Sequence, residues 1–296
     1  MILMVSGRCD IVAFYTDWFM NRLKAGFVDV RNPFNPKLVS RINFENVDAI
    51  MFCTKNPIPI VDRLKEINKP ILFHITITGY NDDIEPNVPD KKDIIEAVKK
   101  ISNIIGKEFV TVRYDPIFIN DKYTLEYHIK AFNKLCTLLD GYASRILISF
   151  IDEYKNVKKN YKYLNYRELN DNDYEIIGKE FSKIAKFHNM NVFTCFEERN
   201  LIEYGFVKDD CLSAKIAYEL TGKLFNGKWM ARKEKRCNCI PMVDIGSYNS
   251  CNHLCKYCYA NYDEDKIINN MNMHNPNSSL LIGELNSDDI IKERYK

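Results

Sequence analysis

The sequence predicts an α/β protein built around a parallel sheet, in the form of a partial (β/α)6 TIM-like barrel. Three observations lead to this fold class. Short apolar runs alternate with longer segments of helical periodicity over the first two thirds of the chain, as in βαβ units. The runs are apolar on both faces, which is typical of buried parallel strands. No glycine-rich phosphate loop follows any run, and this disfavours an open dinucleotide-binding sheet.

The predicted strands are short and rich in β-branched and aromatic residues. They cover residues 2–7, 49–54, 70–79, 109–114, 145–151 and 191–196. Between them, residues 92–105 place isoleucine and valine on one helical face and end at Gly106, a residue that favours helix termination. Residues 124–139 repeat this periodicity, and another helix is predicted over residues 173–188. Six strands joined by helices indicate βαβ units that share one sheet.

Composition and charge narrow the class of protein. Hydrophobic residues make up 46% and charged residues 28% of the chain, which indicates a globular rather than a disordered protein. A net charge of +2 provides no broad positive field, so no stable nucleic-acid partner is expected. The N-terminus lacks the layout of a secretory signal, and no apolar run approaches the ~20 residues of a membrane helix. We therefore expect a cytoplasmic protein without membrane contact.

Polar and ionisable residues follow all six predicted strands. In such sheets the functional groups gather at the carboxyl ends of the strands, so these residues are expected at one rim. The candidates for binding a ligand there are Arg8, Asp10, Lys55, Thr76, Thr78, Arg113, Asp115, Ser149 and Glu197. Cations beside several carboxylates are typical of a site for a charged ligand. The competing interpretation is that chains become polar where they leave the core and that these charges form structural ion pairs.

Five of the ten cysteines cluster near the C-terminus. Cys251, Cys255 and Cys258 follow the spacing C-x3-C-x2-C, and Cys237 and Cys239 precede them. In a reducing compartment such a cluster indicates metal binding rather than disulfides. A zinc site needs four ligands, usually in two pairs, whereas three thiolates in one loop would leave one iron of a [4Fe–4S] cluster open. The spacing favours iron and sulfide, and a zinc site that includes the two preceding cysteines is the alternative.

The segment Cys251-Asn-His-Leu-Cys255-Lys-Tyr257-Cys258 resembles the C-x3-C-x-aromatic-C signature of radical S-adenosylmethionine (SAM) enzymes. This resemblance implies that the three cysteines hold a [4Fe–4S] cluster and that S-adenosyl-L-methionine chelates its fourth iron. Electron transfer would then yield a 5′-deoxyadenosyl radical that abstracts hydrogen from the substrate. The resemblance also implies a full or partial parallel barrel, in agreement with the strand pattern.

The position of the motif departs from most of that superfamily, in which it follows the first strand. Here it lies after all six predicted units. We therefore interpret residues 1–226 as a partial barrel and residues 227–296 as a cysteine-rich, cluster-binding segment that folds back over its mouth. Nearly the whole chain resembles one family of uncharacterised domains, in which the cysteine motif also lies near the C-terminus. The segments that carry the resemblance are SGRCDI (6–11), FCTKNP (52–57), TITGY (76–80), RYDPI (113–117), SFIDEY (149–154), CNC (237–239), DIGSY (244–248), CKYCYAN (255–261) and HNPNSSLLIG (274–283).

Within that family the sequence is similar to queuosine lyases, which release queuine from queuosine or its 5′-phosphate for tRNA queuosine salvage. The resemblance thus implies a radical SAM lyase that acts on a small nucleoside or nucleotide. It also implies an electron donor such as flavodoxin or ferredoxin. The alternatives are a DNA-lesion lyase similar to spore photoproduct lyases and a non-catalytic zinc-binding adaptor.

The resemblance implies roles for individual residues in binding SAM. Tyr257 would pack beside the adenine, unless it serves only to pack the loop. Arg113 or Lys55 would pair with the methionyl carboxylate, and bidentate geometry favours the arginine. The hydroxyls expected at the amino or ribose groups are those of Thr76, Thr78 and Ser149, with strand-end capping as the alternative.

A 7-deazaguanine base presents hydrogen-bond donors that carboxylates bind well. The residues expected to bind the substrate are Arg8, Asp10, Asp115 and Glu197. The acids would equally well form structural pairs with neighbouring arginines. Cys237 and Cys239 are candidates for a second metal site, for thiol hydrogen donors or for packing against the cluster loop. His253, between two motif cysteines, is interpreted as an ordinary loop residue.

Overall fold

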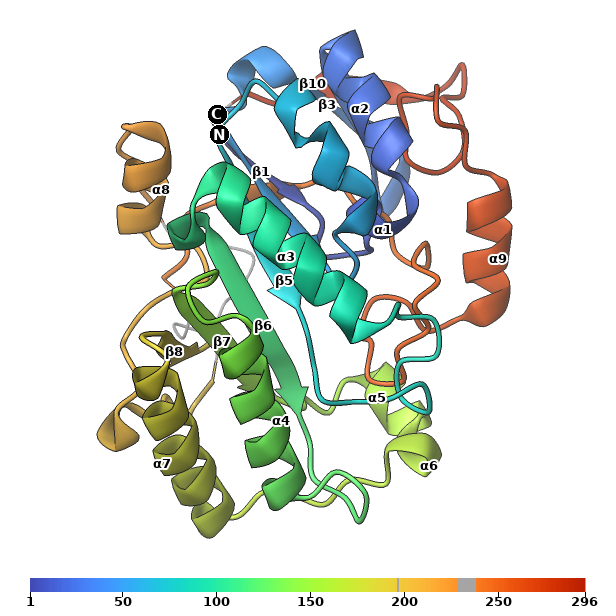
Figure 1. The fold of residues 1–296 in the computed structure, drawn as a ribbon. Helices are drawn as coiled ribbons and strands as arrows, with labels where there is room; N and C mark the ends of the chain where they lie inside the picture. Colours follow the sequence, from blue (N-terminus) through green and yellow to red (C-terminus); the bar gives the residue numbers. More distant parts are fainter. Residues whose placement is uncertain (196, 228–237, 296) are drawn as a thin grey trace.

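In the computed structural model, residues 1–195, 197–227 and 238–295 are described. A sheet of seven parallel strands forms the centre, in the order β8-β7-β6-β5-β4-β1-β9 (Figure 1). The strands are β1 (Ile2–Val5), β4 (Ala49–Thr54), β5 (Ile71–Thr76), β6 (Val110–Ile117), β7 (Arg145–Phe150), β8 (Asn191–Thr194) and β9 (Met242–Asp244). All six predicted strands are present, and the α/β class is confirmed. The seventh strand, β9, was not predicted and pairs with β1.

The order of the strands contains no reversal between β1 and β8. Each new strand adds beside the previous one, and right-handed crossovers then place the connecting helices on one face of the sheet. Figure 1 shows α3, α4 and α7 on this face. The helices between these strands are α1 (Ile11–Phe14), α2 (Thr16–Ala25), η2 (Ile58–Glu66), α3 (Lys91–Ile105), η3 (Lys107–Phe109), α4 (Leu125–Leu138), α5 (Lys155–Lys159), α6 (Tyr161–Leu164) and α7 (Asp171–Phe187). The three predicted helices correspond to α3, α4 and α7.

The sheet separates two hydrophobic cores, because alternate residues of a strand point to opposite faces. On the helix face, Leu3, Phe52 and Ile75 belong to the larger core. On the other face, Met4 and Met51 pack in a smaller core, which α8 (Ala214–Thr221) and segments before β9 complete. Both faces of the strands are therefore buried, as their apolar sequences predicted.

A second, three-stranded sheet has the order β10-β3-β2. An antiparallel hairpin, β2 (Phe27–Asn32) and β3 (Asn35–Asn43), is joined by β10 (Ile290–Glu293), which runs parallel to β3. The other short elements are η1 (Phe44–Asn46), η4 (Ile202–Tyr204) and α9 (Glu264–Asn272). This sheet was not predicted from the sequence, since most of its strand positions are partly or fully exposed and many of them carry polar side chains.

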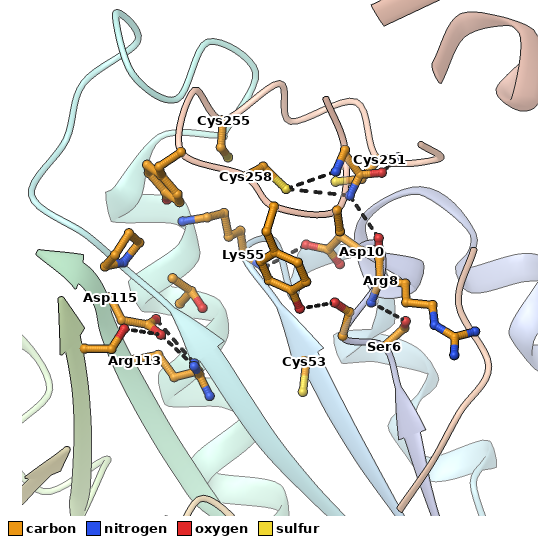
Figure 2. A pocket seen from close by; sticks show the side chains of 18 of the residues that line it. Ser6, Arg8, Asp10, Cys53, Lys55, Arg113, Asp115, Cys251, Cys255 and Cys258 are labelled. Carbon is orange, nitrogen blue, oxygen red and sulfur yellow. Dashed lines mark hydrogen bonds and ion pairs between the residues drawn. The ribbon is translucent and has the colours of Figure 1, made fainter. Parts of the chain in front are cut away.

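The pairing of β9 with β1 brings the cysteine motif to the strand ends. Because the two strands are parallel, the chain leaves β9 at the same edge of the sheet where β1 ends. The loop with the three motif cysteines follows directly and lies over this edge (Figures 1 and 2). The boundary between residues 226 and 227 stays a prediction. Among the described residues, no helix has the length and apolar character needed to cross a membrane.

Candidate functional site

A cavity of about 350 Å³ lies where the strand ends meet the cysteine loop (Figure 2). Its volume falls within the range of roughly 300–1,000 Å³ that is usual for ligand pockets. The predicted residues that line it are Arg8, Asp10, Lys55, Thr76, Arg113, Asp115, Ser149, Glu197, Cys239, Cys251, Cys255, Tyr257 and Cys258. Thr78 is buried away from this lining, and Cys237 lies outside the described residues. The fold thus gathers residues from both ends of the chain around one cavity.

One asparagine holds the cysteine loop against the end of β1. The Asn261 side-chain oxygen accepts hydrogen bonds from the backbone N–H groups of Ser250 (2.8 Å) and Cys251 (3.1 Å). Its amide nitrogen donates to the Arg8 carbonyl oxygen at 2.9 Å. The Asn261 backbone N–H also donates to Cys258 Sγ at 3.3 Å. The sequence analysis included this asparagine in a motif segment but gave it no role, because its partners lie on either side of the loop and on a distant strand end.

A buried histidine fixes the same loop from within. His253 is only 2% exposed, and its Nε2 lies 2.9 Å from Asp10 Oδ2. Its Nδ1 lies 3.2 Å from the Asn87 carbonyl oxygen. Both ring nitrogens therefore lie within hydrogen-bond distance of an oxygen, and the ring is held from two sides. His253 lies in a loop, as expected, and it also anchors the motif to the segment after β1 and to the loop after β5.

Asp10 has several partners inside the protein. Its Oδ1 accepts from the Ala13 backbone N–H at 2.9 Å and so caps α1. Its Oδ2 accepts from the Lys55 backbone N–H at 2.7 Å, besides the contact with His253. The carboxylate expected at the substrate lines the cavity but is engaged in holding three chain segments together.

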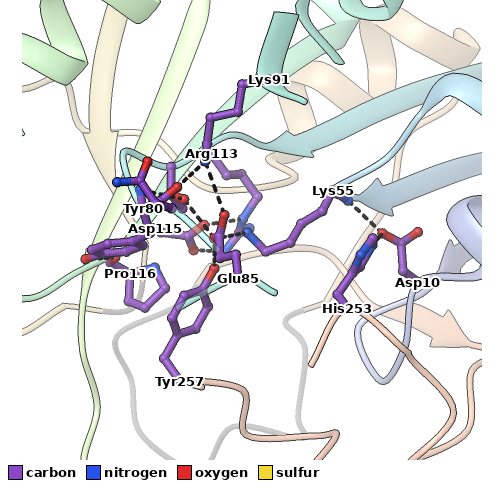
Figure 3. A network of polar contacts seen from close by, with 12 residues as sticks. Asp10, Lys55, Tyr80, Glu85, Lys91, Arg113, Asp115, Pro116, His253 and Tyr257 are labelled. Carbon is purple, nitrogen blue, oxygen red and sulfur yellow. Dashed lines mark hydrogen bonds and ion pairs between the residues drawn. The ribbon is translucent and has the colours of Figure 1, made fainter. Parts of the chain in front are cut away.

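Glu85 is the centre of a polar network on the cavity wall (Figure 3). Its Oε1 accepts from Lys55 Nζ at 2.8 Å, from Thr78 Oγ1 at 2.7 Å and from the Tyr257 hydroxyl. Lys91 Nζ lies 3.6 Å from its other oxygen. Burial raises the pKa of this carboxyl, but the nearby lysines lower it by a larger amount, so that the net shift is downward. Glu85 was not among the predicted site residues, because it lies in an irregular loop and its partners Lys55 and Tyr257 come from distant segments.

Arg113 and Asp115 form another ion pair on the cavity wall. Arg113 Nη2 lies 2.6 Å from Asp115 Oδ2, and Ser149 Oγ donates to the same oxygen at 3.3 Å. Burial lowers the pKa of the guanidinium, but Asp115 raises it, and the pKa lies well above its ordinary value. Both cations expected at the cofactor carboxylate, Arg113 and Lys55, thus have a carboxylate partner in the protein. Of the structural pairs left as the alternative, the one between Asp115 and Arg113 is present.

Asp244, the last residue of β9, shapes the turn after β1. Its Oδ1 accepts from Ser6 Oγ and from the Gly246 backbone N–H, both at 2.7 Å, and its Oδ2 accepts from the Gly7 N–H at 2.9 Å. A Cβ at Gly246 would lie 1.9 Å from Ser6 Oγ, so only glycine fits there. Arg8, which follows this turn, reaches the Gly246 carbonyl at 3.3 Å. Asp244 belongs to one of the motif segments, but it was given no role because β9 was not predicted.

Glu197 also lines the cavity. Its Oε1 accepts from the Phe150 backbone N–H at 2.8 Å, which ties the segment after β8 to the end of β7. Thr76, at the end of β5, lines the cavity between these residues and the cysteine loop. The residues expected at substrate and cofactor therefore share one cavity, although most of them also hold neighbouring segments in place.

The donor set of the cysteine loop is compatible with an iron–sulfur cluster. Cys251 and Cys255 are both 8% exposed, and burial raises the pKa of both thiols. A buried thiolate requires compensating positive charge, which a metal centre supplies. Among the described residues, no three His, Cys, Asp or Glu side chains converge as ligands of a single ion. A cluster binds each thiolate at a different iron, so it needs three separate thiols around one cavity rather than a shared ion.

Comparison with known families gives one match. Residues 2–260 match the model of a family described as "Domain of unknown function (DUF1848)". The matched range includes all strands of the seven-stranded sheet and the three motif cysteines. No curated protein matches the chain.

Proposed function

This protein belongs to the DUF1848 family, a family of domains of unknown function, and we propose that it is a radical SAM enzyme. In this proposal Cys251, Cys255 and Cys258 hold a [4Fe–4S] cluster, and SAM binds in the adjoining cavity. One observation carries the proposal. The cysteine loop lies far along the chain from β1, yet its three cysteines line the same cavity as the strand-end cations and hydroxyls. That arrangement would place the open iron of a bound cluster beside a charged pocket.

We also propose that the sheet is a partial (β/α)6 barrel. The unreversed strand order supports this, because an open doubly wound sheet would contain a switch point. The second core on the face opposite the helices also supports it, since that face would form the interior of the barrel.

The bound cluster and SAM would supply a one-electron cleavage of a carbon–sulfur bond that starts hydrogen abstraction from the substrate. The chain positions and shields this chemistry. Glu85 orients Lys55 and Tyr257 toward the cavity, and Asn261 holds the cysteine loop and donates to Cys258 Sγ. Arg113 offers a charged guanidinium at the wall, with Asp115 fixing its orientation. The buried polar network keeps these groups in place before any ligand enters.

The proposed reaction is cleavage of the carbon–nitrogen bond of queuosine or its 5′-phosphate, with release of queuine. The resemblance of the motif segments supports this substrate. The cavity also offers a cation, Arg8, for a phosphate and two acids, Asp115 and Glu197, for the donors of a base. The proposal includes a cytoplasmic location, a small nucleoside or nucleotide as substrate, and flavodoxin or ferredoxin as electron donor.

Anaerobic reconstitution tests this function. We expect about four irons with matching sulfide per chain, and we expect 5′-deoxyadenosine and queuine after addition of dithionite, SAM and queuosine or its 5′-phosphate. The Cys255→Ala variant should lose both products. One zinc without sulfide would favour the adaptor alternative and overturn the proposal. Formation of 5′-deoxyadenosine without queuine would retain the radical chemistry and reject the substrate.

A further inference from the structure

Three thiols outside the cysteine loop meet at one end of the cavity. Cys195 follows β8, Cys211 precedes α8, and Cys239 precedes β9. The Sγ atoms of Cys195 and Cys211 lie 2.7 Å apart, and the side chain of Cys239 forms a hydrogen-bond contact with Cys211. Three segments that are distant in sequence thus bring their sulfur atoms together.

This thiol group lies between two cavities. All three cysteines line the main cavity together with the motif cysteines. The same three also line a second cavity of about 400 Å³, whose wall includes Lys208 and Asp209. The group is therefore accessible from the proposed radical site on one side and from a separate cavity on the other.

The charge next to the thiols comes from a residue of the main cavity. The Arg113 guanidinium interacts electrostatically with Cys195 and Cys211. The contact with Cys195 and this cation lower the pKa of the Cys211 thiol, but the contact with Cys239 and burial raise it to about 12, so that Cys211 keeps its proton at neutral pH. A cation beside a dithiol stabilises the thiolate that forms when the second sulfur loses its proton. The same guanidinium pairs with Asp115 at the cavity wall, so the thiols and the proposed ligand site share one charged group.

We propose that Cys195 and Cys211 form a redox-active dithiol that gives a hydrogen atom to the substrate radical after bond cleavage. This inference rests on the proposed function. A thiol S–H bond is weaker than the C–H bonds of a sugar, so a carbon radical takes hydrogen from a thiol readily. Two sulfur atoms in contact can then share the oxidation as a disulfide, which a single cysteine cannot do.

The S–H bond of one cysteine breaks homolytically, and a C–H bond forms on the substrate carbon. The neighbouring thiol releases its proton, and the two sulfur atoms bond to each other. The surplus electron passes to an external one-electron carrier of the flavodoxin class. A small dithiol reductant that enters through the second cavity restores both thiols by thiol–disulfide exchange.

A first experiment tests the dithiol on the purified full-length chain without any cofactor. The protein is treated with the thiol oxidant diamide, digested and mapped by mass spectrometry. We expect a disulfide between Cys195 and Cys211 that dithiothreitol reverses, while Cys136, buried in the larger core, stays a thiol. A disulfide that joins either residue to another cysteine, or none at either, would overturn the assignment.

The second experiment follows hydrogen during turnover in D2O. Thiol hydrogen exchanges with solvent, so we expect the sugar product of the wild type to carry one deuterium. Cys195→Ala and Cys211→Ala should still form 5′-deoxyadenosine but should lose most of the labelled product. Cys53→Ala, which removes a thiol elsewhere on the cavity wall, should retain the label, and Cys136→Ala serves as the folding control.

The outcomes separate this inference from the proposed function. Unlabelled product in the wild type, or a label that survives in both variants, overturns the hydrogen donor and leaves the radical enzyme intact. Loss of the label in Cys53→Ala alone would assign the donor to a different thiol and also overturn the proposal. A wild type that forms no 5′-deoxyadenosine overturns the proposed function, and the hydrogen donor with it.

Discussion

At the residue scale, one buried carboxylate organises the wall of the cavity. Glu85 is 3% exposed, and an isolated charge in that position would be strongly destabilising. It is tolerated because Lys55 and Lys91 compensate its charge and two hydroxyls donate to the same oxygen as Lys55. The network therefore orients Lys55 and Tyr257 before a ligand binds, which lowers the entropy that ligand binding has to overcome.

Replacement of this carboxylate tests the network. Glu85→Gln keeps the shape and one acceptor but leaves the Lys55 ammonium buried without its counter-ion. We expect a loss of about 3–5 kcal/mol in the free energy of unfolding, measured by urea denaturation at neutral pH. Because the pKa of Glu85 is lowered in the folded state, this stabilisation is present above the ordinary carboxyl pKa and is lost as the pH falls through the lowered value.

A matched control separates burial from pairing. Glu96 on α3 lies 2.8 Å from Lys99, but its side chain is 64% exposed. Glu96→Gln should cost at most about 1 kcal/mol, because water already screens this pair. Equal losses for the two variants would show that the buried network contributes no more than a surface pair.

At the element scale, a buried histidine joins α4 to β6 and to the segment after it. His128 Nε2 lies 2.9 Å from the Phe118 carbonyl, and its Nδ1 lies 2.8 Å from the Tyr114 hydroxyl. A carbonyl only accepts, so Nε2 donates, and Nδ1 accepts from the tyrosine. The neutral ring satisfies both contacts. Burial lowers the pKa of His128 to about 4, which keeps the ring neutral at physiological pH.

This histidine makes the packing of α4 sensitive to acid. The unfolded chain binds a proton at His128 near its ordinary pKa, whereas the folded chain binds it only near pH 4. The stabilisation is therefore complete above about pH 6.5 and declines towards pH 4, by roughly 3 kcal/mol. Urea denaturation across this range should show the decline, and His128→Gln should reduce its slope. An unchanged slope in the variant would show that a group other than His128 causes the loss of stability in acid.

At the scale of the whole molecule, the C-terminal segment completes the surface of the N-terminal helices. Trp18 on α2 is fully buried, and its indole nitrogen donates to the Ser278 carbonyl at 2.9 Å. Arg22 donates to the neighbouring Asn277 carbonyl at 2.8 Å, and the backbone N–H of Asp29 on β2 donates to the Ser279 carbonyl. Residues 274–283 thus form part of the same folded unit as α2 and β2, although they lie beyond the family match.

Truncation measures this long-range contact. In a Trp229→Phe background, removal of residues 274–296 should expose Trp18, so its emission should move to longer wavelength and acrylamide quenching should increase. Removal of residues 285–296 alone deletes β10, whose residues are all exposed, and should leave Trp18 buried. The same emission shift in both truncations would show that residues 274–284 are not what shields Trp18 from solvent.

The sequence by itself determined the elements whose signals are local. Apolar runs and helical periodicity predicted six strands and three helices, and β4 spans the predicted residues 49–54. These patterns are visible in the sequence because each strand is buried on both faces and each helix is buried on one face. The spacing of Cys251, Cys255 and Cys258 likewise identified the candidate cluster loop without any structure.

Tertiary structure decided how distant segments meet. The pairing of β9 with β1 carries the cysteine loop to the strand ends, and only that pairing gives roles to Asp244 and Asn261. Glu85 and the contact between Cys195 and Cys211 were equally invisible, because their partners lie in other segments of the chain. Periodicity and spacing reflect contacts within one helix, strand or loop. These sites depend instead on the order in which the strands pair and on which side chains that order buries.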